Sequence, residues 1–212
     1  LQGSESVIAW IMSQCERQAL SPDGLGAQIF TAVDRGEVTA VEAAMLVRSL
    51  LSAGVDTTIN SLGNALFCFA RFPQQWRLLK ERPELVRSAI DEILRFEGAL
   101  MNFFRTTSQA VNLGGYHIPK HEKVLVPFAA GNRDPKHWPD AHKFDITRET
   151  KGHLGFGGGV HMCVGQMVAR LEVELILTQL LQQADTITLA GTPVRRLNNA
   201  LRGLSSLPLR IA

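Results

Sequence analysis

A glycine-rich segment with one cysteine most constrains what this chain can fold into. It reads FGGGVHMCVG over residues 156–165 and leads directly into a helical pattern from Gln166 to Gln183. A thiolate at Cys163 is stabilised there by the unpaired amides of the first helical turn and by the helix dipole. The glycines leave one face free of side chains, so a large flat ligand can lie against the backbone. The segment predicts a soft-metal or reactive-sulfur site flanked by Phe156 and His161.

Other sites for such a loop fit the sequence less well. A phosphate loop needs a lysine, and a dinucleotide loop needs a glycine spacing, that this segment lacks. Zinc can be bound by His153, His161 and Cys163, but the chain has no Cys-x-x-Cys partner. A buried structural cysteine is the default for any single Cys.

A long helix is predicted to begin at the capping box Thr39-Ala40-Val41-Glu42 and to run to Arg71. It would be roughly 45–50 Å long. Because it is apolar on most faces, we expect it to be buried centrally. The polar sequence AGVDTT at 53–58 interrupts it, and polar groups inside a buried helix are costly without partners. The alternative is a tolerated polar kink with Asp56 facing the surface.

Two charged positions are also candidates for function. Glu92 and Arg95 are three residues apart on one helix face, where they can form an ion pair. Arg105 follows an apolar stretch of a predicted strand, where a cation needs an anionic partner. The alternatives are an ordinary exposed ion pair and a surface charge on an edge strand.

The remaining pattern predicts a mostly α fold with small β-sheets. Further helices are expected over 7–19, 74–81 and 83–97, and strands over 103–107, 110–113 and 123–126, with short strands in 186–211. Residues 127–159 show little periodicity and many Gly and Pro residues, which predicts a long functional loop. The chain starts without methionine, inside a predicted helix, so we expect 1–212 to form one partial domain.

Composition limits the class of protein. A net charge of +2 over 212 residues gives no argument for nucleic acid or membrane binding. The three cysteines are widely spaced and odd in number, which predicts a reducing cytoplasm, and Cys68 in an apolar run is expected to be inert packing. The sequence shows no apolar stretch near the ~18 residues that span a bilayer.

Taken together, the motifs resemble those of the cytochrome P450 family of haem-thiolate monooxygenases. The cysteine loop matches the family's ligand loop, AGVDTT its oxygen-activating motif, and Glu92 with Arg95 its Glu-x-x-Arg motif, in the family's order. The resemblance covers nearly the whole chain. It implies the C-terminal, haem-binding half of the fold, with the N-terminal half absent.

The resemblance also implies roles for individual residues. Haem b would take Cys163 as axial iron ligand, and Asp56 and Thr57 would form an acid–alcohol pair that delivers protons during oxygen activation. His161 and Arg105 would bind the propionates. Further residues implied at the cofactor are Phe156, Gly157, Gly165 and Gly54, and those implied at the substrate pocket are Ser52, Ala53, Met101 and Phe104.

The buried Glu92–Arg95 pair of the family is completed by an arginine or histidine in a pattern like Asp-Pro-x-Arg-Phe-Asp. The corresponding sequence here is DAHKFD over 140–145. Lys143 lacks the planar fork of an arginine, which leaves Lys143 and His142 as candidates for the third contact.

The function implied is insertion of one oxygen atom of O2 into a small organic substrate. Residues 99–105 and 201–208 resemble soluble bacterial members that act on para-substituted benzoates, which implies hydroxylation or O-demethylation of an aromatic carboxylic acid. Electrons would come from a ferredoxin with an NAD(P)H-dependent reductase, docking near Lys136, Lys143 and Lys151. The alternatives are a non-catalytic haem-binding fragment and a zinc-bearing helical module, and we expect the 212 residues alone to be inactive.

Overall fold

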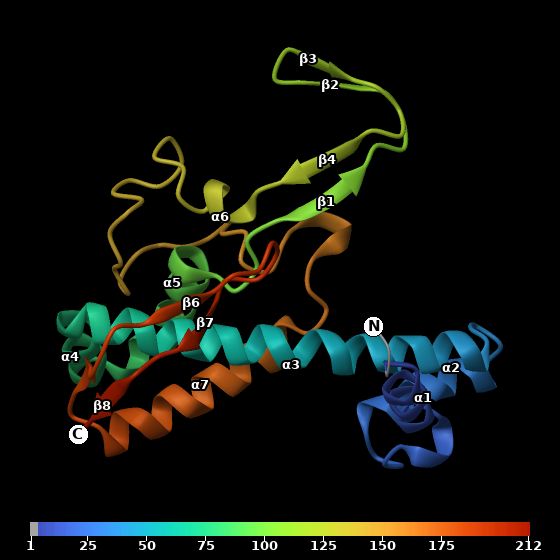
Figure 1. Cartoon of the computed structure of the whole chain (residues 1–212), viewed down its shortest axis with the longest axis horizontal. Coiled ribbons are helices and arrows are strands. Elements are labelled where there is room, and N and C mark those ends of the chain that lie inside the picture. Colours follow the sequence, from blue (N-terminus) through green and yellow to red (C-terminus); the bar gives the residue numbers. More distant parts are fainter. Residues whose placement is uncertain (1–3) are drawn as a thin grey trace. The chain divides into compact units, whose positions relative to one another are not determined.

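The computed structural model describes residues 4–212 and separates into two compact units (Figure 1). The first unit ends at Asp56, and the second runs from Thr57 to Ala212. The predicted mainly α fold with small β-sheets is confirmed, whereas the single partial domain stays a prediction. In the described part of the chain, every helix is too short or too polar to cross a membrane.

The first unit contains α1 (Ser4–Gln14), the 3₁₀ helix η1 (Arg17–Ala19), α2 (Leu25–Asp34) and the first half of α3 (Ala40–Arg71). The expected helix over 7–19 is too long, because the chain turns at Cys15, whose side chain is fully buried in the small core of this unit. The capping box is confirmed: the Thr39 N–H donates to a Glu42 carboxylate oxygen at 2.7 Å, and the Glu42 N–H donates to Thr39 Oγ1 at 3.2 Å.

The expected central burial of α3 is wrong for the middle of the helix. Buried side chains lie near its two ends, at 43–47 and 64–69. Between them Leu51, Val55 and Ile59 are 52%, 58% and 61% exposed, because no described element covers this stretch. The apolar sequence therefore predicted the helix correctly but not how much of its surface is buried.

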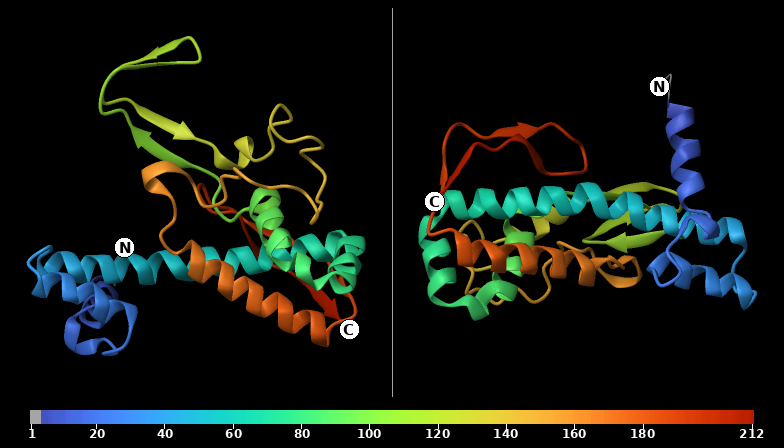
Figure 2. Two further views of the ribbon diagram at one scale, coloured as in Figure 1. Left: turned by 180° about the vertical axis from the view of Figure 1, so that it is seen from behind. Right: turned by 90° about the horizontal axis from the view of Figure 1, so that it is seen from below.

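The second unit packs the end of α3 with α4 (Pro73–Glu81), the 3₁₀ helix η2 (Pro83–Leu85), α5 (Val86–Glu97) and α7 (Gln166–Gln183). Figure 2 shows α7 running past these helices, and α5 and α7 are in contact. Aromatic rings fill the core, with Phe69 edge-on to Trp76 and Phe144 at centroid distances of 5.1 and 5.9 Å. This core supports the segment that leads to Cys163.

Four antiparallel strand pairs accompany the helices. They are β1 (Phe103–Thr106) with β4 (Lys123–Val126), β2 (Val111–Leu113) with β3 (Tyr116–Ile118), β5 (Ile187–Leu189) with β8 (Leu209–Ile211), and β6 (Val194–Arg196) with β7 (Gly203–Ser206). The strand β3 was not expected; it follows Gly114 and Gly115, whose φ angles of 58° and 85° form the hairpin turn. The predicted loop over 127–159 is largely irregular but begins with the short helix α6 (Phe128–Gly131).

Candidate functional site

Main-chain hydrogen bonds within and next to the cysteine loop fix its conformation before α7 begins. The Cys163 N–H donates to the Phe156 carbonyl at 2.9 Å, and the Gly157 N–H donates to the Leu154 carbonyl at 3.0 Å. Gly157 and Gly159 have φ angles of 71° and 62°, a left-handed conformation that favours glycine. One 3₁₀ turn, η3 (Gly159–His161), brings the chain to Cys163, whose side chain is partly exposed.

Apolar side chains next to Cys163 are unusually exposed. Val160, Val164 and Met167 are 97%, 84% and 73% exposed. A Cβ on Gly165 would lie 3.9 Å from the Cys163 sulfur, and one on Gly158 would meet no atom within 4 Å. A soft sulfur ligand beside uncovered apolar surface fits a flat apolar cofactor with a soft metal centre, so the residues present fit haem.

The zinc alternative finds no support in the geometry. Across residues 4–212, no three His, Cys, Asp or Glu side chains are grouped to hold a metal ion. His153 is engaged elsewhere, since its Nε2 lies 3.2 Å from Asp91 Oδ1 and its Nδ1 accepts the Gly155 N–H at 3.0 Å.

Asp91, His153 and Arg170 connect α5, the segment just before the cysteine loop, and α7. Asp91 binds both His153 and Arg170, and the Arg170 guanidinium lies 5.0 Å from the centre of the Phe156 ring. Burial raises the pKa of Asp91, but the hydrogen bonds from His153 and Arg170 outweigh it and hold this pKa below its usual value. Sequence reasoning missed this cluster, because its members are far apart in the chain and follow no common spacing.

Glu92 and Arg95 form a fully buried bidentate ion pair, with Nε–Oε2 and Nη2–Oε1 distances of 2.7 and 2.8 Å. Arg95 also donates to the main-chain carbonyls of Asn132, Ala141 and Lys143. The pair therefore ties α5 to the irregular segment after α6.

The third charged member of this cluster is Arg148, whose Nε lies 3.4 Å from Glu92 Oε1. The expectation of Lys143 or His142 is wrong: the Lys143 ammonium points to Asp145 at 3.9 Å, and His142 Nδ1 lies 3.4 Å from Arg133. The guanidinium of Arg148 has several N–H donors. It can therefore donate to the Pro139 and Asp140 carbonyls and to the Glu92 carboxylate at the same time. Arg148 lies in an irregular segment, and no sequence pattern indicated that it would contact Glu92.

Arg105 lies on β1 opposite Val124 and donates to the Phe104 carbonyl at 2.9 Å. None of the ion pairs among residues 4–212 includes Arg105, so its charge is open to an external anion. The side chain of Phe104 is 57% exposed, Met101 is half-buried, and His161 is exposed on η3. No hydrogen bond joins Arg105 to His161 within the described residues.

The predicted oxygen-activating residues lie where the two units meet in sequence. Asp56 is the last residue of the first unit and is exposed, and Thr57 is the first residue of the second and half-buried. Ser52, Ala53 and Gly54 are exposed one turn earlier, and a Cβ on Gly54 would meet no atom within 4 Å. The buried setting expected for them is wrong in this chain, and their roles stay predictions.

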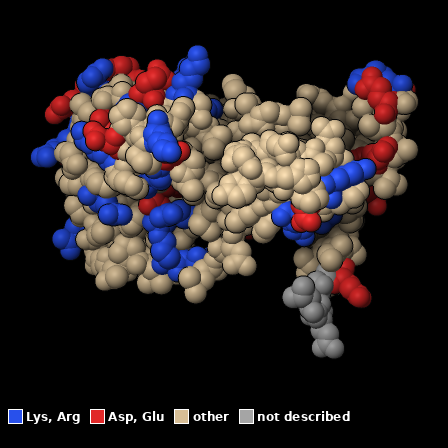
Figure 3. Space-filling model, turned by 90° about the horizontal axis from the view of Figure 1, so that it is seen from above, with Lys and Arg blue, Asp and Glu red and all other residues tan. Residues whose placement is uncertain are grey.

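The other two cysteines are not exposed. Cys15 and Cys68 are fully buried, and burial raises the pKa of the Cys68 thiol well above its usual value. The predicted inert packing of Cys68 is confirmed. Charged side chains of both signs are interspersed on the face in Figure 3.

Comparison with known proteins places these features in a family. The profile described as Cytochrome P450 matches residues 17–211. The chain is 51% identical over 203 residues to Cytochrome p450 CYP199A2 of Rhodopseudomonas palustris, a match covering 96% of this chain and 49% of that protein. It is 34% identical to 6-deoxyerythronolide B hydroxylase of Saccharopolyspora erythraea, covering 99% of this chain and 54% of that one.

Solved structures of similar proteins also superpose on this chain. The tirandamycin C-bound P450 monooxygenase TamI superposes with a TM-score of 0.90 at 32% identity, covering 99% of this chain and 54% of that one. Cytochrome P450 CREJ in complex with (4-ethylphenyl) dihydrogen phosphate gives 0.89 at 29% identity, covering 97% and 53%. The chain thus spans about half the length of the curated relatives it matches.

Proposed function

The chain belongs to the cytochrome P450 family, and from this premise we propose that it serves a haem-dependent monooxygenase that inserts one oxygen atom of O2 into a small organic substrate. The observation that carries the proposal is the cysteine loop. It presents one partly exposed sulfur among uncovered apolar side chains, just before the first turn of α7.

We propose that the sulfur of Cys163 would hold the iron of haem b. When bound, the haem supplies the oxygen-activating chemistry, which an axial thiolate promotes by donating electron density. The exposed side chains of Val160 and Val164 would then be covered by the cofactor and exclude water from the sulfur. Gly157 and Gly165 allow the backbone to approach, and Phe156 holds the Cys163 N–H through its carbonyl.

Arg105 and His161 are the proposed partners of the haem propionates. Arg105 has no carboxylate partner among the described residues, and the exposed His161 stands two residues before Cys163. An arginine fork can bind a carboxylate through two parallel hydrogen bonds, so Arg105 would hold a propionate of the cofactor.

Asp56 and Thr57 are proposed to move protons during oxygen activation. The Asp56 side chain is exposed and can exchange protons with water, while the half-buried Thr57 hydroxyl can pass one on. Residues proposed for the pocket wall are Ser52, Ala53, Met101 and Phe104.

For the substrate we propose an aromatic carboxylic acid, hydroxylated or O-demethylated. The support is the similarity of residues 99–105 and 201–208 to members that act on para-substituted benzoates. The neighbouring structure of CREJ also holds a para-substituted phenyl ring with an acidic group. Electrons are proposed to come from a ferredoxin and its reductase, and the exposed Lys136, Lys143 and Lys151 are candidate contacts for an acidic partner.

The absorption spectrum of the reduced, CO-treated full-length protein tests whether Cys163 is the iron ligand. We expect the red-shifted Soret band of a thiolate-bound haem, and its loss in Cys163→Ala. The matched control is Cys68→Ala, which removes a thiol buried in the core of the second unit and should keep the band. A band that survives in Cys163→Ala would refute the assignment.

A second measurement separates an enzyme from a non-catalytic haem-binding protein. With ferredoxin, reductase and NADH supplied to the full-length protein, Thr57→Ala should still consume O2 but form less product per NADH. Thr58→Ala, one position along α3, should couple as the wild type does. Equal coupling in both variants would remove Thr57 from the proton path.

A further inference from the structure

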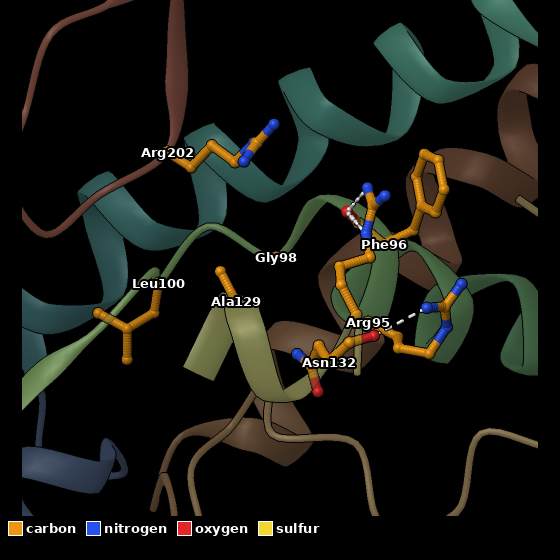
Figure 4. Close-up of a pocket in the computed structure, with 8 residues that line it drawn as sticks. Arg95, Phe96, Gly98, Leu100, Ala129, Asn132 and Arg202 are labelled. Atoms are coloured by element: carbon orange, nitrogen blue, oxygen red, sulfur yellow. Dashed lines mark hydrogen bonds between the residues drawn. The ribbon is translucent and has the colours of Figure 1, made fainter. Parts of the chain in front are cut away.

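A cavity of about 170 Å³ lies in the second unit, between the end of α5, α6 and the chain before β7 (Figure 4). Three arginines line it: Arg95, Arg133 and Arg202. Leu100 and Ala129 form its apolar side. We call it the arginine cavity. Nothing in the proposed oxygenase chemistry uses it.

The charges around the arginine cavity do not balance. Glu92 is shared by Arg95 and Arg148. Glu97, only 3% exposed, is shared by Arg195 and Arg202 at 2.9 and 2.6 Å. Arg95 and Arg202 thus each share their carboxylate with a second arginine, and Arg133 adds a third cation to the lining. A partly desolvated cation that has no paired carboxylate is stabilised when an anion binds beside it.

Arg133 is the cation left without a carboxylate among the described residues. Its guanidinium stacks 3.7 Å from the centre of the Phe96 ring and donates through Nε to the Phe96 carbonyl at 3.2 Å. Burial lowers the pKa of Arg133; the nearby Glu97 raises it, and Arg95 and Arg202 lower it further. Its surroundings therefore leave its charge only partly compensated.

An amide donor at the same cavity is also unused. Asn132 is 3% exposed, and its Oδ1 accepts the Leu154 N–H at 2.7 Å, which fixes the orientation of the amide. No hydrogen bond uses its Nδ2 among residues 4–212. Figure 4 shows this side chain at the cavity, beside Ala129. This nitrogen is therefore available to an acceptor that enters the cavity.

We propose that the arginine cavity binds a small soluble oxyanion, of the size of phosphate or acetate. Arg133 and Arg202 supply the charge, and Asn132 Nδ2 donates a hydrogen bond. Charge-assisted hydrogen bonds of this kind are short and strong, and a ligand that binds only the folded state stabilises it. The bound anion would hold α5, α6 and the chain before β7 together.

Calorimetric titration of the purified protein with inorganic phosphate tests the site, with chloride holding the ionic strength constant. We expect saturable binding with one site per chain, and a melting temperature that rises with phosphate. In Asn132→Asp the retained oxygen still accepts the Leu154 N–H, but a carboxylate now occupies the place of the anion. This variant should bind phosphate at least tenfold more weakly.

Two further variants make the test independent of that substitution. Asn112→Asp adds the same charge on the exposed strand β2 and should bind phosphate like the wild type. Ala129→Leu fills the cavity without changing charge and should lose binding. Absence of saturable phosphate binding to the wild type would overturn the proposal. Equal affinity in Asn132→Asp and Asn112→Asp would overturn it too.

Discussion

Replacing Arg95 by lysine should destabilise this protein strongly although the charge is kept. Arg95 makes two bonds to Glu92 and donates to carbonyls of Asn132, Ala141 and Lys143 at 2.8, 3.0 and 3.2 Å. One lysine nitrogen cannot reach all these acceptors, so at least two buried groups lose their donor. At about 1–3 kcal/mol for each unmade buried hydrogen bond, the loss is about 2–6 kcal/mol.

That loss is a large part of the ~5–15 kcal/mol by which a typical domain is stable. For a chain of this size it corresponds to a fall in melting temperature of roughly 5–20 °C. Thermal and urea unfolding followed by circular dichroism would measure it. The control is Arg87→Lys, because the Arg87 side chain is 83% exposed in its ion pair with Glu174 and should change stability by less than about 0.5 kcal/mol. An Arg95→Lys protein as stable as Arg87→Lys would refute the reasoning that the fork geometry matters.

Two other predictions concern backbone fit and pH. Gly98→Ala should cost about 1–3 kcal/mol in unfolding free energy, because a Cβ there would clash with the Leu94 carbonyl oxygen. Gly63→Ala, with no atom within 4 Å, should instead stabilise α3 by roughly 0.5–1 kcal/mol, and equal denaturation midpoints would contradict both statements. Because the pKa of Asp91 is lowered on folding, its contribution is complete above the unfolded-state pKa of about 3.9 and is lost as the pH falls through the lower folded value. Urea unfolding between about pH 2 and pH 6 should show Asp91→Asn losing less stability on acidification than the wild type, and parallel pH profiles would count against the Asp91–His153–Arg170 cluster.

Local sequence patterns determined the elements that carry the candidate site. The helix predicted over 166–183 has those bounds in the structure, and the capping box at Thr39 forms as expected. Such features depend on residues within a few positions of one another, so their physics is contained in short stretches of chain. The pairing of Glu92 with Arg95 belongs to this group, since three residues along a helix bring two side chains to one face.

Tertiary structure alone decided which distant groups complete each local feature. Arg148 joins Glu92 across 56 residues of sequence, and Arg170 meets Asp91 across 79. The periodicity of each segment does not show such contacts, because they form only when elements distant in sequence pack together, a loop on α5 for Arg148 and α7 on α5 for Arg170. The exposure of the middle of α3 was decided in the same way: its sequence fixes that it is apolar, but only the packing of other elements determines whether that surface is buried.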